Sequence, residues 1–160
     1  MGVYTDTDEY PSTISPARLF KALVVDAHNL IPKLLPHAVK SIELIQGDGG
    51  AGSIMQINFI EGSHMKSVKN RVDEINKDTF TYNYTLIEGE ALKDKFASIA
   101  HETKFEATPD GGSMNKITNK YYLKGDIEIN EEDIKAGKEK VLGIYKVVET
   151  YLLQNPDVYA

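Results

Sequence analysis

Apolar residues recur with helical spacing near the end of the chain, between Asn130 and Gln154. Asn130 is a favourable N-cap residue, and the three acidic residues after it stand where the helix dipole favours negative charge. The pattern predicts one long amphipathic helix, with Pro156 marking its far end. The apolar positions that share one side of this helix are Ile134, Val141, Tyr145, Val148 and Leu152.

The middle of the chain, residues 39–123, changes to the two-residue period of strands. The clearest case is residues 79–87, in which Phe80, Tyr82, Tyr84 and Leu86 alternate with polar residues. Turn residues rich in Gly, Asn, Asp and Glu separate successive segments, which favours consecutive antiparallel strands joined by hairpins. Residues 2–10 alternate more weakly and are expected to form an edge strand.

Two short helices are expected before this region. Ser15 followed by Pro16 is typical of a helix start, and Asp26 is expected to cap a second helix that ends before Pro36. The apolar side of the long helix must pack on another element, and a curved sheet from the middle of the chain is the partner we expect. No repeat or linker is apparent, so the sequence predicts one α+β domain over residues 1–160.

Composition narrows the function. Apolar residues make up 41% of the chain and charged residues 26%, as in ordinary soluble globular proteins. No apolar run or signal segment indicates a membrane, and the lack of cysteine excludes a disulfide scaffold and fits a cytoplasmic protein. The net charge of −6 argues against general nucleic-acid binding, which needs a basic surface.

A glycine-rich segment, Gly47, Gly49, Gly50 and Gly52, matches the spacing of a dinucleotide-binding loop. That interpretation requires a helix to follow, whereas residues 53–59 have a strand pattern. A Walker phosphate loop is excluded because Gly52 is followed by Ser53 and Ile54 instead of a Lys-Ser or Lys-Thr pair. We expect a hairpin with several positive φ angles, whose exposed amides could still hold an anion weakly.

Other chemistry has weak support. The four histidines, His28, His37, His64 and His101, show no metal-ligand spacing, so neither a metal site nor a cofactor is expected. The aromatic residues expected to face inward are more informative, namely Phe59, Phe80, Tyr82 and Tyr84 on the strands and Tyr145 and Tyr151 on the long helix. The tyrosines among them, together with Arg71 or Lys138, suit either a core with its hydroxyls bonded at the edge or the wall of a binding site, and the pattern alone does not separate these two interpretations.

Several stretches together resemble the plant pathogenesis-related class 10 proteins, the family of the major birch pollen allergen. The resemblance covers the full length. The matching stretches are Met1-Gly2-Val3, Arg18-Leu19-Phe20-Lys21-Ala22, Asp48-Gly49-Gly50, Tyr82-Asn83-Tyr84, Ile87-Glu88-Gly89, Pro109-Asp110-Gly111-Gly112-Ser113, Tyr121 to Asp126, and Lys135-Ala136-Gly137-Lys138-Glu139-Lys140.

The resemblance implies a helix-grip (START-like) fold, with seven antiparallel strands curled around the C-terminal helix and a cavity between them. A dry void of ~300 Å³ at ~24 cal/mol per Å³ would cost roughly 7 kcal/mol, so such a cavity should hold water or ligand. By position, the implied ligand-binding residues are Leu23, Asn29, Phe59, Arg71, Tyr82, Tyr84, Thr103, Lys138, Val141 and Tyr145. For each of them core packing is the alternative, and for Arg71 it is a surface salt bridge.

The function that the resemblance implies is binding, storage or transport of amphipathic plant metabolites such as flavonoids, cytokinins, steroids and phenolics, linked to defence. It also implies recognition by IgE antibodies, and we expect a monomer. Ribonuclease activity is the enzymatic alternative, but only Glu149 and Tyr151 match the residues proposed for it, and Ala97 replaces a glutamate and cannot transfer a proton. A role as an abscisic acid receptor that regulates a phosphatase is disfavoured, because residues 88–92 lack the Ser-Gly-Leu-Pro gate of those receptors.

Overall fold

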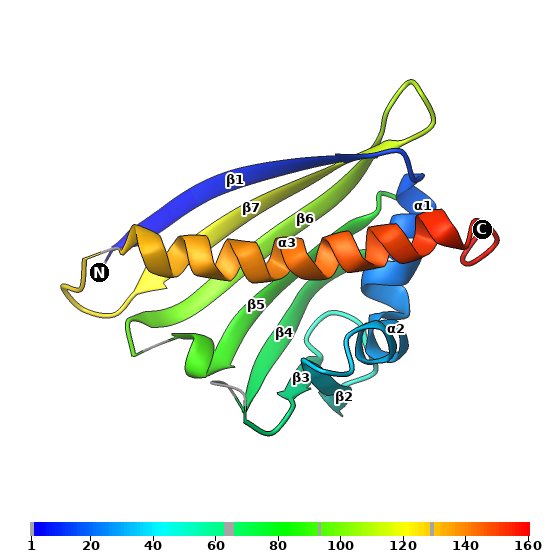
Figure 1. Cartoon of the computed structure of the whole chain (residues 1–160). Coiled ribbons are helices and arrows are strands. Elements are labelled where there is room, and N and C mark those ends of the chain that lie inside the picture. Colours follow the sequence, from blue (N-terminus) through cyan, green and yellow to red (C-terminus); the bar gives the residue numbers. More distant parts are fainter. Residues whose placement is uncertain (1, 63–65, 93, 129) are drawn as a thin grey trace.

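The computed structural model of the protein describes residues 2–62, 66–92, 94–128 and 130–160. Seven antiparallel strands form one sheet in the order β1-β7-β6-β5-β4-β3-β2 (Figure 1). The strands are β1 (Val3–Ser12), β2 (Val39–Gln46), β3 (Ile54–Phe59), β4 (Ser67–Asn76), β5 (Thr81–Gly89), β6 (Phe96–Ala107) and β7 (Ser113–Leu123). The helical elements are α1 (Pro16–Phe20), the π-helical turn η1 (Lys21–Val25), α2 (Ala27–Leu34), the 3-10 turn η2 (Glu90–Leu92) and α3 (Glu131–Gln154).

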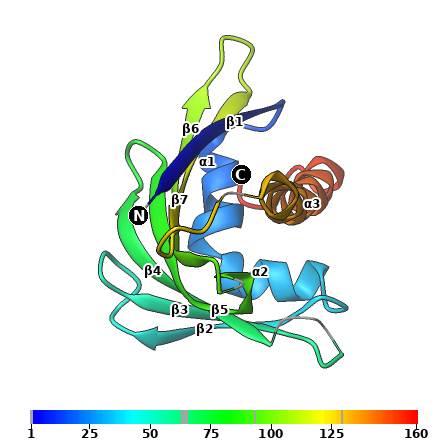
Figure 2. The same cartoon turned by 90° about the vertical axis from the view of Figure 1, so that its left-hand side faces the viewer.

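The sheet curls around α3. Figure 2 shows the strongly curved sheet on one side of α3, with α1 and α2 closing one end of the space between them. Six hairpin connections would give a simple meander, but β1 instead pairs with β7, so the two ends of the strand region meet along one edge. The predicted seven-stranded antiparallel sheet and its long C-terminal helix are therefore confirmed.

Local capping explains where the helices begin. The Asn130 side chain accepts a hydrogen bond from the Glu132 amide at 2.9 Å, and the Ser15 hydroxyl accepts one from the Arg18 amide at 3.4 Å. Asp26 differs from the prediction. It occupies the N-cap position of α2, but its carboxylate caps no backbone amide and instead accepts from the Asn29 amide group and the Tyr159 hydroxyl.

Phe80 also differs from the prediction, which placed it on a strand face. It precedes β5 in a turn with φ of 55°, and its ring packs against Phe20 of α1 with the ring centroids 5.7 Å apart. The turn is favoured by Asn76, whose side-chain oxygen accepts from the amides of Asp78 and Thr79. The strand period therefore holds only from Thr81 onward.

The core gathers at the two ends of α3 and is interrupted in between. Val148 and Leu152 are fully buried in one cluster with residues of α1, η1, α2 and β6, and Ile134 lies in a second cluster with residues of β4 to β7. Val141 has the same heptad position as Ile134 and Val148, yet 39% of its surface is exposed. The apolar side of α3 is thus partly open around Val141, although Tyr145, one turn further on, is buried against Tyr10 of β1.

Arg18 fixes the last turn of α3. Its guanidinium donates to the carbonyl oxygens of Leu152, Asn155 and Val158 at 3.1, 2.9 and 3.0 Å. These are carbonyls at and beyond a helix C-terminus, where a cation is favoured and the backbone acceptors have no helical partner. One side chain of α1 therefore holds the C-terminal end of α3 in place.

Candidate functional site: a cavity under the middle of the long helix

A cavity of about 220 Å³ lies where α3 does not pack on the sheet. Residues from β1, β3 to β7 and α3 line it. Its apolar wall includes Phe59, Val68, Leu86, Phe96, Ile99, Ile117, Ile134 and Val141, and its polar wall includes Asp8, Asn70, His101, Thr103, Asn119 and Lys138. The volume is below the roughly 300–1,000 Å³ of common ligand pockets, so this space suits a small ligand.

Strand register brings four polar and aromatic residues into one row across the sheet. Asp6 of β1 pairs with Asn119 of β7, Asn119 pairs with His101 of β6, and His101 pairs with Tyr84 of β5. Directly opposed residues in an antiparallel pair have neighbouring side chains on the same face. Asp8 lies two residues along β1 and so shares the face of Asp6.

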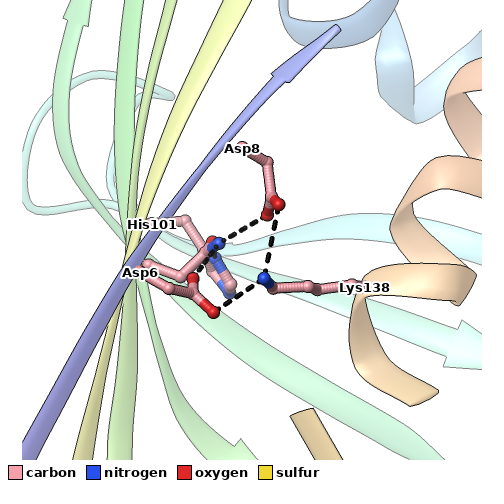
Figure 3. Close-up of polar contacts among 5 residues, drawn as sticks. Asp6, Asp8, His101 and Lys138 are labelled. Atoms are coloured by element: carbon pink, nitrogen blue, oxygen red, sulfur yellow. Dashed lines mark hydrogen bonds and ion pairs between the residues drawn. The ribbon is translucent and has the colours of Figure 1, made fainter. Parts of the chain in front are cut away.

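A hydrogen-bonded network connects this row to α3 (Figure 3). The Asn119 Nδ2 donates to Asp6 Oδ1 at 2.9 Å and to Asp8 Oδ2 at 3.1 Å. The Lys138 Nζ of α3 lies 2.7 Å from Asp6 Oδ2 and 3.3 Å from Asp8 Oδ1. Because Asn119 donates through its nitrogen, its Oδ1 accepts from His101 Nδ1 at 2.7 Å, which leaves Nε2 of the neutral imidazole as an acceptor.

The charge states in this network follow from burial and pairing. Burial lowers the pKa of His101, although the Asn119 hydrogen bond and the Asp6 charge act in the opposite direction, so the ring is neutral at pH 7. For Lys138, burial acts to lower the pKa, but the two aspartates outweigh it and raise the pKa above its usual value. Lys138 therefore remains a protonated ammonium and is a poor nucleophile.

The tyrosines beside the cavity remain neutral phenols. Burial raises the pKa of Tyr84, and it raises that of Tyr121 to about 12, where the charge of Asp6 adds to the effect. The Tyr84 ring lies 4.9 Å from the His101 ring and 5.1 Å from the Tyr82 ring, measured between centroids. The Tyr84 and His101 rings line this cavity, whereas the Tyr82 ring lines the second cavity described below.

Half of the ligand-binding residues predicted from the sequence line this cavity. They are Phe59, Tyr84, Thr103, Lys138 and Val141. Lys138 lies there, but its ammonium is paired with two aspartates and does not stand alone as a cation for ligand oxygens.

Three of the other predicted residues lie near apolar clusters or a different cavity. Tyr82 lines a second cavity of about 490 Å³, and Leu23 packs against the buried cluster at the C-terminal end of α3. Tyr145 is buried, and its ring packs on Tyr10 with the centroids 5.7 Å apart. The side chain of Tyr145 thus belongs to the core, which is the alternative that the sequence left open.

Asn29 and Arg71 line neither of these two cavities. Asn29 is exposed on α2, where it bonds to Asp26 and His28. Arg71 is 48% exposed and its Nε lies 2.8 Å from Asp73 Oδ1, so it forms the surface salt bridge given as its alternative. On β4 the residues on either side of it, Asn70 and Val72, line the two cavities, and strand alternation then turns Arg71 outward.

The second cavity lies between η1, α2 and the strands β2 to β5. Val24, Val25 and His28 form its helical side, and Met55 and Tyr82 are on its sheet side. The glycine-rich hairpin contributes Asp48, Gly49 and Gly50 to its rim. Burial, followed by the charge of Asp73, raises the pKa of Tyr82 to about 12, so this phenol is also neutral.

The glycine-rich segment forms the predicted hairpin, between β2 and β3. Gly47, Gly49 and Gly52 have φ angles of 93°, 99° and 88°. The Gly49 amide donates to the Ser53 hydroxyl and the Gly50 amide to the Asp48 carboxylate, both at 2.9 Å. The Gly52 amide donates to the Val72 carbonyl. Because these amides already have partners, the loop offers little of the anion-binding surface that remained open from the sequence.

The ribonuclease positions do not converge. Ala97 follows Phe96, which lies in the cluster around Ile134, whereas Glu149 follows Val148 in the cluster at the other end of α3. Fourteen residues at ~1.5 Å each separate these two ends by roughly 21 Å. Glu149 instead lies 3.5 Å from the Lys146 ammonium. No chemical step requiring these positions together is supported.

The polar residues of the network were missed from the sequence. Asp6, Asp8, His101 and Asn119 are far apart along the chain, and His101 has no carboxylate pair close to it in sequence. The signal available in the sequence was the alternation in residues 3–10, which puts Tyr4, Asp6, Asp8 and Tyr10 on one strand face. In the structure this face points inward, and the Tyr4 ring packs against Tyr121. Two carboxylates on an inward face need partners.

Two further findings concern the described residues only. Within residues 2–62, 66–92, 94–128 and 130–160, no group of three or more His, Cys, Asp or Glu side chains could hold a metal ion. No helix in the same ranges is both long and apolar enough to cross a membrane. His64, one of the four histidines considered above, lies outside the described residues.

The fold and the cavity define an α+β helix-grip protein with an internal space between its curved sheet and its C-terminal helix. The chain belongs to the pathogenesis-related protein Bet v 1 family, whose model matches residues 1–155. It is 55% identical to major allergen Pru ar 1 of Prunus armeniaca and 55% identical to major strawberry allergen Fra a 1.04 of Fragaria ananassa. Each match spans 159 residues and covers 99% of both chains.

Solved structures agree with this assignment. The crystal structure of Ara h 8.0201 matches with a TM-score of 0.88 and 38% identity, over 96% of this chain and 100% of that one. Norcoclaurine synthase from Thalictrum flavum, solved with dopamine and hydroxybenzaldehyde, has a TM-score of 0.74 over 96% of this chain and 88% of that one. Its 18% identity shows a shared fold only.

Proposed function

We propose that this protein binds small amphipathic metabolites in the cavity under α3 and stores or carries them in the plant cytoplasm as part of defence. Flavonoids, cytokinins, steroid-like compounds and phenolics are the ligand classes we propose. The observation that carries this proposal is the gap in packing at Val141. An otherwise buried helical stripe is open there, above a cavity of about 220 Å³.

The wall chemistry suits such ligands. Aromatic and aliphatic side chains cover most of the cavity, and four of its polar residues, Asp8, His101, Asn119 and Lys138, belong to one hydrogen-bonded network. An amphipathic molecule can therefore bury its apolar body while its polar end replaces water at the network. No covalent step is proposed, because Lys138 is held as an ammonium and the nearby phenols are neutral.

Filling the cavity tests the proposal. A fluorescent amphiphile is titrated into the protein and then competed with flavonoids. Val141→Trp places a large ring at the cavity mouth and should weaken binding by at least about tenfold, or about 1.4 kcal/mol. Ala136→Trp is the matched control, since Ala136 is exposed on the same helix and lines neither cavity.

The outcomes separate clearly. Wild type and Ala136→Trp are expected to enhance the fluorescence of the amphiphile equally, whereas Val141→Trp is expected to need a higher concentration for the same enhancement. Unchanged fluorescence at saturating wild-type protein would refute the proposal. Equal binding by all three proteins would place the ligand elsewhere, and the second cavity at Tyr82 would then be the next region to block.

We also propose that IgE from sensitised donors recognises this protein, and that the protein is a monomer. The support is the allergen names of relatives that are 55% identical over nearly the full length. Inhibition of serum IgE binding to a strawberry allergen preparation by this protein tests recognition. Native mass spectrometry measures its oligomeric state and any retained metabolite in the same spectrum.

A further inference from the structure

The hydrogen-bonded network of Asp6, Asp8, His101, Asn119 and Lys138 beside the cavity has more negative than positive charge. Two carboxylates, Asp6 and Asp8, share one ammonium, that of Lys138. Asn119 adds hydrogen bonds but no charge, and His101 is bonded to the uncharged carbonyl of Asn119. With a neutral imidazole, the four ionisable groups of the network have a formal charge of about −1 at neutral pH.

The remaining charged residues that line the cavity do not cancel this excess. Asp133 of α3 is paired with Lys95 at 2.8 Å. Lys140 also lines the cavity, but it is exposed to solvent at the rim, where its charge is screened. The side chains of Asp6 and Asp8 are only 15% and 21% exposed, so their excess charge acts through a poorly screened environment.

Aromatic side chains share the cavity wall with Asp8. Tyr10 of β1, Tyr84 of β5 and Tyr121 of β7 all line the same cavity as Asp8. The charges of Asp6 and Asp8 raise the pKa of Tyr10 and Tyr121, in addition to the effect of burial, which places both phenols within electrostatic range of the carboxylates. A carboxylate and aromatic rings in the wall of one cavity attract a cation by direct pairing and through the ring faces.

We propose that the cavity selects ligands that carry a protonated amine on a short arm from an aromatic body. The ammonium lies beside Asp8 and completes the charge balance with Lys138, and the aromatic body lies against the apolar wall that includes Phe59, Phe96 and Ile99. This inference rests on the proposed binding function and names the ligand chemistry that the site prefers. An anionic ligand of the same shape is disfavoured by the same excess charge.

Three probes of matched shape test the selectivity for a protonated amine. They are naphthylethylamine, naphthylethanol and the carboxylate anion of naphthaleneacetic acid, here called the acetate. Each is titrated into the wild-type protein by isothermal calorimetry at neutral pH. The amine is expected to bind at least about tenfold more tightly than the alcohol, equivalent to about 1.4 kcal/mol, and the acetate most weakly. Equal affinities for amine and alcohol, or tighter binding of the acetate, would overturn the inference but leave the proposed function standing.

Failure of all three probes to bind would count instead against ligand binding in this cavity. The wild-type ratio therefore decides the inference even where a variant does not fold. The unfolded fraction of each variant is checked first by circular dichroism.

Two variants assign the selectivity to the network. Asp8→Asn keeps the side-chain shape and should reduce the amine-to-alcohol ratio to about twofold or less. Lys138→Gln removes the cation and should increase the ratio, which a merely structural role for Lys138 would not do. Glu9→Gln is the matched control, because Glu9 is exposed on the opposite face of β1 and loses the same charge. An unchanged ratio in Asp8→Asn would overturn the assignment to Asp8.

Discussion

Asn119 is the residue on which the polar network depends most, so its truncation gives a sharp test of the structure. The side chain is 4% exposed and makes three hydrogen bonds, two of them to carboxylates. Bonds to charged groups contribute ~1.5–3 kcal/mol each and a neutral one ~1 kcal/mol, for a gross total of roughly 4–7 kcal/mol. Water from the adjoining cavity can replace part of this, so we expect Asn119→Ala to lose about 3 kcal/mol.

Urea unfolding followed by circular dichroism measures this loss as a lower midpoint at an unchanged slope. At ~2–4 °C per kcal/mol for a domain of this size, the melting temperature should fall by roughly 6–12 °C. Asn58→Ala is the matched control. Asn58 is also a strand asparagine bonded to a carboxylate, that of Glu43, but its surroundings are partly exposed and we expect a loss below ~1 kcal/mol. Equal losses in the two variants would refute the view that Asn119 organises a buried network.

Three further predictions concern pH, packing and the hairpin. Because the folded-state pKa of His101 lies below its unfolded value, the folded protein binds fewer protons, and stability is lost as the pH falls below about 6.5, by at most ~1.4 kcal/mol per pH unit. His101→Gln should flatten that dependence in urea unfolding between pH 7 and pH 5. Leu152→Ala should cost ~2–5 kcal/mol by the same measurement, whereas the neighbouring exposed Leu153→Ala should cost under ~0.5 kcal/mol. Gly47→Ala should cost more than ~1 kcal/mol in thermal unfolding, since its φ is 93° and a Cβ would lie 2.4 Å from the Ser53 hydroxyl oxygen.

Local patterns were sufficient to predict most of the elements. The N-caps at Ser15 and Asn130 and the strand alternation in residues 81–87 are decided by neighbouring residues, and the structure has them as expected. The exceptions have local or tertiary causes. Phe80 adopts a positive φ in a turn and packs against α1, and the Asp26 carboxylate bonds to the Tyr159 hydroxyl and the Asn29 side chain rather than to backbone amides of α2.

The site was less predictable because it depends on pairing between distant strands. Asp6 contacts Asn119 because β1 pairs with β7 at one edge of the sheet. The local alternation of residues does not predict which strands pair. Tyr82 and Tyr84 share a strand face, yet Tyr82 packs near α1 and α2 while Tyr84 faces the cavity under α3. Sequence alternation predicts the face of a residue, but the helices decide which of the two spaces it lines.

The long helix α3 is held in place at both ends. Ile134 anchors one end in the sheet, and at the other Val148 and Leu152 are buried while Arg18 holds the terminal carbonyls. Between these ends, Lys138 is paired with Asp6 and Asp8 of β1 and Tyr145 packs on Tyr10, whereas Val141 is partly exposed and lines the cavity. We therefore expect guests of different thickness to displace mainly the turn around Val141, while both ends of α3 stay packed.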